Sequence, residues 1–360
     1  MTYSLSVDRI EKYLREVFRK PVKVINLNLL GTGWHAEAWR VEVDVEGEGV
    51  KRFVLKFLKG EKGFGHDYPA DRAQVLLMAH KDFNKLPNHV KSIDVGYLDN
   101  FGDLHSVGNY EEFFILMEEA SGRPYIEDLR DILKRRELSD RDLKRLEILV
   151  KYLVDIHSVK FEGDVNSMKR LYYRRIRDLV GHGEMIMGVV DSAYPDDFEL
   201  IDRLREVEVL ALQWRWRLKK YYSRLCQVHG DYHPFNIWFR ENDELIVLDR
   251  SRGEWGEPAD DVTCLLTNYI WFSLLDTGKF SGVFENMFRI FLKKYIEYTG
   301  DEDILNVCQP WFAFRAIVIA SPLFYPDNPP NVREALLNFA VNVMKIDRFD
   351  PDIVNDLLRY

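Results

Sequence analysis

The chain has few cysteines, no long apolar run and no excess of positive charge. Its three cysteines, Cys226, Cys264 and Cys308, lie far apart and form no Cys-x-x-Cys pair, which argues against a structural zinc site and a secreted disulfide framework. No run approaches the roughly eighteen apolar residues of a membrane span, and the first residues lack a basic-then-apolar secretion signal. The sequence therefore predicts a cytoplasmic protein with no membrane partner.

The formal net charge is −9, and general nucleic-acid binding needs a basic face. Segments 169–175 and 214–222 interleave basic and aromatic residues and could stack on a single strand, but the acidic total favours ordinary helices with an aromatic core face. We therefore expect no nucleic-acid partner. The acidic charge is compatible with a cationic small molecule, and it can equally serve solubility alone.

The 360 residues are enough for two lobes around large cores. Short β-branched runs come first and helical periodicities dominate from Tyr125 onward, which predicts class α+β with an N-terminal antiparallel sheet. The predicted strands are 22–30, 38–45, 52–58, 91–98 and 113–118, and the predicted helices are 7–20, 69–81, 140–158, two within 160–225, 263–276, 281–299, 303–325 and 331–346.

One stretch carries most of the chemistry. It reads His229-x-Asp231-x-x-x-x-Asn236 in a Gly- and Pro-containing loop, enters an apolar run, turns, and leaves a second apolar run at Asp249. Downstream, Gly256-x-Pro258-x-x-Asp261 fits a turn into the next helix, which Asp261 would either cap or connect to the loop backbone. A carboxylate, an amide and a second carboxylate thus follow one another on a loop–strand–turn–strand path.

This segment resembles the catalytic hairpin of protein-kinase-like phosphotransferases, and its sequence motif is similar to that of the aminoglycoside phosphotransferase and choline kinase family. The resemblance implies that Asp231 receives the proton of an acceptor hydroxyl, while Asn236 and Asp249 hold Mg²⁺ against the nucleotide phosphates. It also implies that His157 is structural and that His229 braces the loop through main-chain contacts.

The same resemblance implies a bilobal fold. Residues 1–118 would form the nucleotide-binding lobe, with an antiparallel sheet and one main helix; residues 119–122 the hinge; and residues 123–360 the helical catalytic and substrate-binding lobe. The implied activity is transfer of the γ-phosphoryl group of ATP, with GTP not excluded, to a hydroxyl of an aminoglycoside-, sugar- or amino-alcohol-like molecule. A protein serine/threonine kinase and an inactive nucleotide-binding scaffold are the alternatives.

Three features of the first lobe extend the resemblance. Gly31-Thr32-Gly33 between two strands fits a phosphate-covering loop, although an ordinary hairpin turn explains it too; no Gly-x-x-x-x-Gly-Lys-Ser/Thr is present, which disfavours a P-loop enzyme. Lys56 inside an apolar strand is either an edge lysine or the lysine that holds the nucleotide phosphates. Its carboxylate partner would be Asp71, where the family usually has Glu.

The segment after the predicted strand 113–118 resembles the family's hinge. Main-chain groups at Glu118 and Ala120 would there bind the adenine edge. A strand that simply ends in a turn explains the same residues, because a backbone contact does not depend on the side chain.

Overall fold

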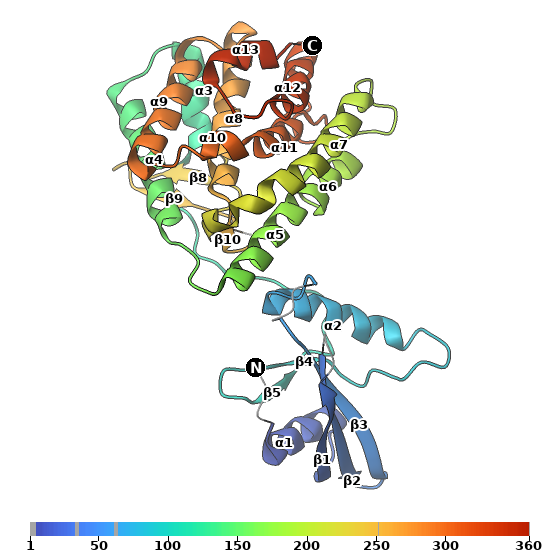
Figure 1. The fold of residues 1–360 in the computed structure, drawn as a ribbon. Helices are drawn as coiled ribbons and strands as arrows, with labels where there is room; N and C mark the ends of the chain where they lie inside the picture. The colour runs from blue at the N-terminus through green and yellow to red at the C-terminus, as the bar shows by residue number, and fades with distance from the viewer. Residues whose placement is uncertain (1–4, 33–35, 61–63, 251, 360) are drawn as a thin grey trace. The chain divides into compact units, whose positions relative to one another are not determined.

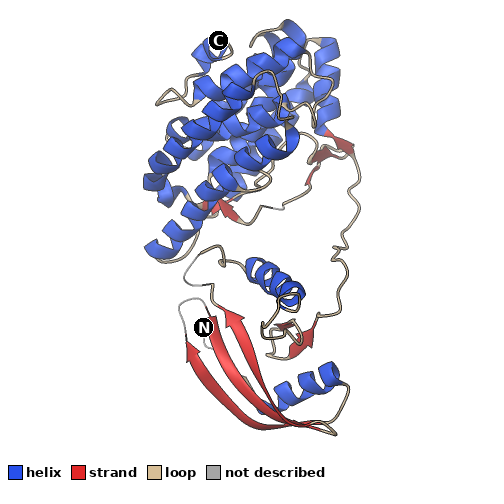
Figure 2. Cartoon of the chain, turned by 90° about the vertical axis from the view of Figure 1, so that its right-hand side faces the viewer, coloured by secondary structure: helices blue, strands red, loops and turns tan. Residues whose placement is uncertain are grey.

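The computed structural model describes residues 5–32, 36–60, 64–250 and 252–359. The chain divides into two compact units, Met1–Met117 and Glu118–Tyr360 (Figure 1). Strands dominate the first unit and helices the second (Figure 2). We describe each unit by itself.

The first unit contains a three-stranded antiparallel sheet in the order β1-β2-β3. Alternation in β2 places Val41, Val43 and Val45 in a core with Ile10 and Leu14 of the amphipathic helix α1. The elements are α1 (Val7–Phe18), β1 (Val22–Thr32), β2 (Ala36–Val45), β3 (Gly49–Leu58), α2 (Pro69–Phe83), β4 (Gly96–Leu98) and β5 (Leu104–Ser106). The predicted helices 7–20 and 69–81 and the first three predicted strands are confirmed within a few residues.

Two predicted strands of this region are wrong in whole or in part. Only Gly96–Leu98 of the run 91–98 is a strand, and it pairs with β5, which lies in a segment predicted to be a link. The run 113–118 has no regular structure, and the side chains of Phe114 and Leu116 are 94% and 92% exposed. An apolar run becomes a strand only where a neighbouring strand takes up its backbone hydrogen bonds, and among the described residues none pairs with this run.

The second unit is mainly helical, as predicted. Two short sheets, β6-β8-β9 and β7-β10, are the exception. Its elements are β6 (Arg123–Pro124), α3 (Tyr125–Arg135), α4 (Asp140–Ser158), α5 (Val165–Gly181), α6 (Ile186–Ala193), α7 (Ile201–Leu218), η1 (Lys219–Arg224), β7 (Cys226–Gln227), β8 (Ile237–Phe239), β9 (Leu245–Val247), β10 (Trp255–Gly256), α8 (Pro258–Thr277), α9 (Gly282–Thr299), α10 (Ile304–Val307), α11 (Gln309–Ala320), α12 (Pro330–Val343), η2 (Pro351–Ile353) and α13 (Val354–Leu357).

Helix α8 is the centre of this unit. Every residue from Pro258 to Leu274 is buried, as expected of a helix with neighbours on all sides. It packs against α9 and α11 and also touches α3, α4 and α12. The predicted helix 303–325 is divided into α10 and α11 at Cys308. Within the described ranges, no helix combines the length and the apolar character needed to cross a bilayer.

Candidate active site

The loop 228–236, between β7 and β8, is held by the first turn of α8. Asp261 accepts hydrogen bonds from the backbone N–H groups of His229 and Gly230, both at 2.7 Å, while its own side chain is fully buried. Gly230 has φ +87°, a left-handed conformation that a glycine adopts without strain. The helix is capped instead by Glu257, whose side chain accepts from Ala259 N. Of the two roles predicted for Asp261, the loop anchor is therefore the one observed.

Two histidines support this anchor. His157 lies 3.1 Å from Asp261 through Nε2 and 2.8 Å from the Tyr295 hydroxyl through Nδ1. His229 Nδ1 accepts from the backbone N–H of Asp231 at 3.2 Å. Burial alone would raise the pKa of Asp261, but the bonds from His157 and the loop lower it. The structural roles predicted for both histidines are confirmed.

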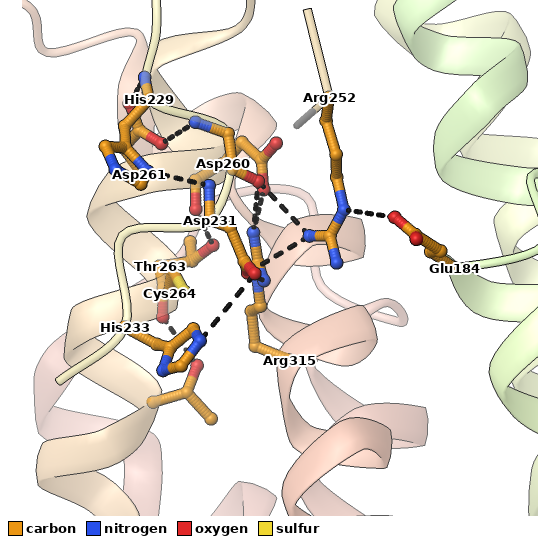
Figure 3. Close-up of polar contacts among 12 residues, drawn as sticks. Glu184, His229, Asp231, His233, Arg252, Asp260, Asp261, Thr263, Cys264 and Arg315 are labelled. Atoms are coloured by element: carbon orange, nitrogen blue, oxygen red, sulfur yellow. Dashed lines mark hydrogen bonds and ion pairs between the residues drawn. The ribbon is translucent and has the colours of Figure 1, made fainter. Parts of the chain in front are cut away.

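Asp231 is bound by two arginines through a single oxygen. Its Oδ1 accepts from Arg315 Nη1 at 2.6 Å and from Arg252 Nη1 at 3.1 Å (Figure 3). The same two guanidiniums also donate to Gly230 O, at 3.0 and 3.2 Å. Oδ2 receives no hydrogen bond from the described residues, and His233 Nε2 lies 3.7 Å from it. The carboxylate is thus fixed at one oxygen and available at the other.

These arginines belong to a larger buried network. Arg315 Nη2 donates to Asp260 Oδ1 at 2.6 Å, and Arg175 pairs with the other oxygen of Asp260. Arg252 Nε lies 3.4 Å from Glu184. Three guanidiniums (Arg175, Arg252 and Arg315) and three carboxylates (Glu184, Asp231 and Asp260), contributed by α5, α8, α11 and three loops, therefore form ion pairs around the loop 228–236. Figure 3 labels all of them except Arg175. Such a network of paired charges favours one loop conformation.

The charges around Asp231 set two pKa values. Burial alone would raise the pKa of Asp231, but Arg315 and Arg252 lower it to about 2. Burial lowers the pKa of His233 to about 4, with Arg315 and Arg252 adding to the effect and Asp231 opposing it. At neutral pH, Asp231 is therefore an anion and His233 is neutral.

Asn236 and Asp249 lie at the ends of the paired strands β8 and β9. Leu248 N donates to Asn236 O at 2.8 Å, which brings the residue before Asp249 opposite Asn236. Asn236 Nδ2 donates to Asp231 O at 3.1 Å. Among the described residues, neither Asn236 Oδ1 nor the Asp249 carboxylate has a hydrogen-bond partner. Asp249 has φ +58°, an uncommon conformation for a residue with a side chain.

These two oxygen donors fit Mg²⁺. The ion prefers amide, carboxylate and water oxygens, and usually takes one or two protein carboxylates together with substrate phosphates. In the part of the chain that the structure describes, no group of three or more His, Cys, Asp or Glu side chains could hold a metal by itself. A site completed by a nucleotide is therefore the kind that these residues can form.

The first unit brings two of the predicted nucleotide residues into one row. Gly31 pairs with Ala38, and Ala38 pairs with Lys56, so Gly31 and Lys56 are two strands apart across the sheet. Lys56 lies on the face opposite the α1 core, together with the exposed Val54. Gly33, the other predicted loop glycine, lies outside the described residues.

Asp71, the predicted partner of Lys56, forms a capping box at the start of α2. Its carboxylate accepts from Tyr68 N at 2.7 Å. Glu118 and Ala120 lie in a segment without regular structure, where backbone groups are not committed to a helix or sheet. The nucleotide-binding roles of Lys56, Asp71, Glu118 and Ala120 stay predictions.

A pocket of about 770 Å³ opens beside Asp231, entirely within the second unit. Residues of α3, α6, α8 and α11 line it, together with the segment 324–328. Its size is in the range of roughly 300–1,000 Å³ that is usual for small-molecule sites. Asp231, His233, Arg252 and Arg315 all contribute to the wall.

The model of the family described as "Phosphotransferase enzyme family" (APH) matches residues 27–285, more than half of the chain. The chain belongs to this phosphotransferase family. The family and the protein-kinase-like α+β fold predicted from the sequence are thereby confirmed. No sequence match was found among curated proteins.

Several solved structures of kinases are similar to this phosphotransferase, all at low identity. They include amicoumacin kinase hAmiN in complex with AMP-PNP, Ca²⁺ and Ami (14% identity, TM-score 0.39, 91% of both chains covered), a Plasmodium vivax ethanolamine kinase (11%, 0.35, 92% of this chain and 80% of that one) and a glucosamine kinase (15%, 0.36, 94% and 92%). At such TM-scores these likenesses carry no argument about activity.

Sequence reasoning missed Arg252 and Arg315 of this phosphotransferase. Arg315 lies beyond the segment that the family model matches. A usable signal was present, since Arg315 is the single charged residue of α11, whose sequence is otherwise almost wholly apolar. A charge on a buried helix needs a partner, and only a fold could show that the partners are Asp231 and Asp260.

Proposed function

We propose that this phosphotransferase is an ATP- and Mg²⁺-dependent kinase that phosphorylates a hydroxyl group of a small molecule. The observation that carries the proposal is Asp231, a buried carboxylate fixed through Oδ1 and open at Oδ2 on the wall of a pocket of ligand size. Family membership supports the reaction class, and the pocket supports a small acceptor.

In this mechanism Asp231 Oδ2 accepts a hydrogen bond from the acceptor hydroxyl and orients its oxygen toward the γ-phosphoryl group. With a pKa of about 2, Asp231 is too weak a base to remove the proton beforehand. The proton moves to Asp231 as the new O–P bond forms and the bond to the nucleoside diphosphate breaks. Positioning and charge neutralisation then supply most of the acceleration.

Asn236 and Asp249 would hold Mg²⁺, which would neutralise charge on the phosphate oxygens. For the nucleotide itself, we propose Gly31, Gly33 and Lys56 at the phosphates. Asp71 would orient Lys56, and the backbone at Glu118 and Ala120 would bind the base. The choice between ATP and GTP depends on the backbone contacts at this hinge, and nucleotide titrations decide it.

An inactive nucleotide-binding scaffold is the second candidate, because Asp71 serves the capping box at the start of α2 and stands where the family usually has Glu. A scaffold would bind nucleotide and never turn it over. A protein serine/threonine kinase would turn nucleotide over only with a protein acceptor. Nucleotide consumption with a panel of hydroxylated small molecules separates these alternatives from the proposed kinase.

Asp249→Ala should weaken Mg²⁺-dependent nucleotide binding by at least about tenfold, or 1.4 kcal/mol, because one of two proposed metal ligands is lost. Titration calorimetry with Mg²⁺ and a non-hydrolysable ATP analogue measures this. Glu254→Ala is the matched control, since it removes an exposed carboxylate from the same turn. Wild-type affinity in Asp249→Ala would show that the metal assignment is wrong.

Arg315→Gln should move the acid limb of the pH profile of kcat/KM to higher pH. Asp231 must be ionised to accept the hydroxyl proton, and its low pKa depends first on Arg315. Without that charge the pKa of Asp231 rises, so acid inactivates the variant earlier. Arg315→Lys, which keeps the charge, should shift the limb less. Arg240→Gln, an exposed change, is the control; an unmoved limb in Arg315→Gln would contradict the positioning role.

A further inference from the structure

The wall of the pocket beside Asp231 is rich in aromatic rings. Trp271 donates its indole N–H to Asn328 Oδ1 at 2.7 Å, and the Tyr325 ring packs edge-to-face on it at 5.0 Å. Phe272 packs on the same indole at 4.9 Å, and Phe324 adds a half-exposed ring to the lining. These rings offer a largely apolar surface, and the indole N–H of Trp271 is already paired.

The charges in the same wall cancel. Three acids line the pocket, and two of them, Asp231 and Glu184, pair with arginines that also line it. The third, Asp327, is exposed and has no ion pair among the described residues. Arg252 and Arg315 pair with Asp231 and Glu184, whereas Arg130 pairs with Glu127, which lies outside the lining. A ligand at Asp231 therefore meets a carboxylate that two guanidiniums already bind.

We propose that the acceptor is uncharged where it enters this pocket, with a ring or other apolar part against Trp271, Phe324 and Tyr325 and a hydroxyl at Asp231. This inference rests on the proposed function and names the chemical class of its acceptor. An ammonium group at Asp231 would have to lose its water beside Arg252 and Arg315, and the carboxylate that it would meet there is already bound by these two guanidiniums. A polycation such as an aminoglycoside would incur this cost several times.

The sequence alone pointed the other way, because a net charge of −9 is compatible with a cationic acceptor. That charge is spread over the chain, whereas binding depends on the charges in the pocket wall. The aromatic rings could still attract a cation through their faces. In this pocket the guanidiniums of Arg252 and Arg315 line the same wall as those rings and oppose a further cation.

A pair of probes that differ only in charge tests the proposal: 2-phenylethanol and 2-phenylethylammonium, with choline as a quaternary ammonium alcohol. Binding to the full chain is measured by titration calorimetry at millimolar ligand without nucleotide. The alcohol should bind at least about tenfold more tightly than either cation. Equal or tighter binding of a cation, or no binding of the alcohol, would overturn the proposal.

Three exposed positions allow variants that are expected to fold. Phe324→Ser should weaken binding of 2-phenylethanol several-fold. Leu323→Ser, an equally exposed apolar change at the next residue but outside the lining, should leave it unchanged. Ser192→Asp adds an unpaired carboxylate to the lining and should strengthen binding of 2-phenylethylammonium. If Leu323→Ser and Phe324→Ser weaken binding equally, the probe does not sit in this pocket and the proposal fails.

The same preparations separate this inference from the proposed function. If Mg²⁺-dependent nucleotide binding is present but a cation binds as tightly as 2-phenylethanol or more tightly, the acceptor class is wrong and the kinase proposal stands. If 2-phenylethanol binds more tightly than the cations but no nucleotide binds, the pocket assignment stands and the kinase proposal fails.

Discussion

Asp231→Ala is expected to lower the rate of phosphoryl transfer by about 10²- to 10⁴-fold, the usual contribution of a positioned general base, while nucleotide binding stays near wild type. The reason is its place in the network: Asp231 offers Oδ2 to the acceptor, whereas Asn236 and Asp249 offer the oxygens proposed for the metal. Single-turnover kinetics with saturating nucleotide, beside calorimetric binding, measures the two effects separately.

Alanine also removes a partner of Arg315 and Arg252, so a second variant isolates the chemistry. Asp231→Asn keeps an oxygen for both guanidiniums but cannot take up the proton, and should lose turnover nearly as severely. Asp202→Ala, an exposed change on α7, controls for general damage. If Asp231→Asn turned over within a few-fold of wild type, the base would have to be another residue.

Asp261→Ala should reduce the stability of the second unit by about 3–5 kcal/mol, the range for breaking a buried charged contact. The carboxylate is fully buried, and its loss leaves His157 and the backbone N–H groups of His229 and Gly230 without their acceptor. Thermal and urea unfolding followed by circular dichroism measure the change.

Asp140→Ala is the matched control, because Asp140 is also an acid in the first turn of a helix but is exposed. It should change stability by less than about 0.5 kcal/mol. The surviving folded fraction of Asp261→Ala should also turn over poorly, since the loop that carries Asp231 has lost its anchor. Wild-type stability in Asp261→Ala would mean that the loop holds its conformation without this carboxylate.

The parts of the fold that local patterns specify were predicted well. Helix α1 has a clear apolar stripe and a Ser6 cap, and β2 alternates strictly between core and open face. The run 113–118 has equally apolar residues, but no strand of the described residues pairs with it, and a strand prediction for it was wrong. Pairing is a property of the whole unit, so composition could not decide it.

The residues of the candidate site likewise fall into those that local sequence motifs indicate and those that only long-range contacts reveal. Asp231, Asn236 and Asp249 could be predicted as site residues because they are close together in sequence and follow a family motif. Arg252 and Arg315 were missed, since what makes them important is a contact with Asp231 across a long stretch of chain. Asp261 had two possible roles from its helix-start position, and only the hydrogen bonds to the loop distinguish them.

The most direct test of the central claim is a thermal-shift titration with Mg²⁺·ATP, Mg²⁺·GTP and Mg²⁺ alone, on the wild type and on Asp249→Ala. A ligand that binds only the folded state raises its unfolding midpoint by mass action. A kinase predicts a Mg²⁺-dependent rise with at least one nucleotide, strongly reduced in Asp249→Ala. No rise with either nucleotide at millimolar concentration would contradict the account.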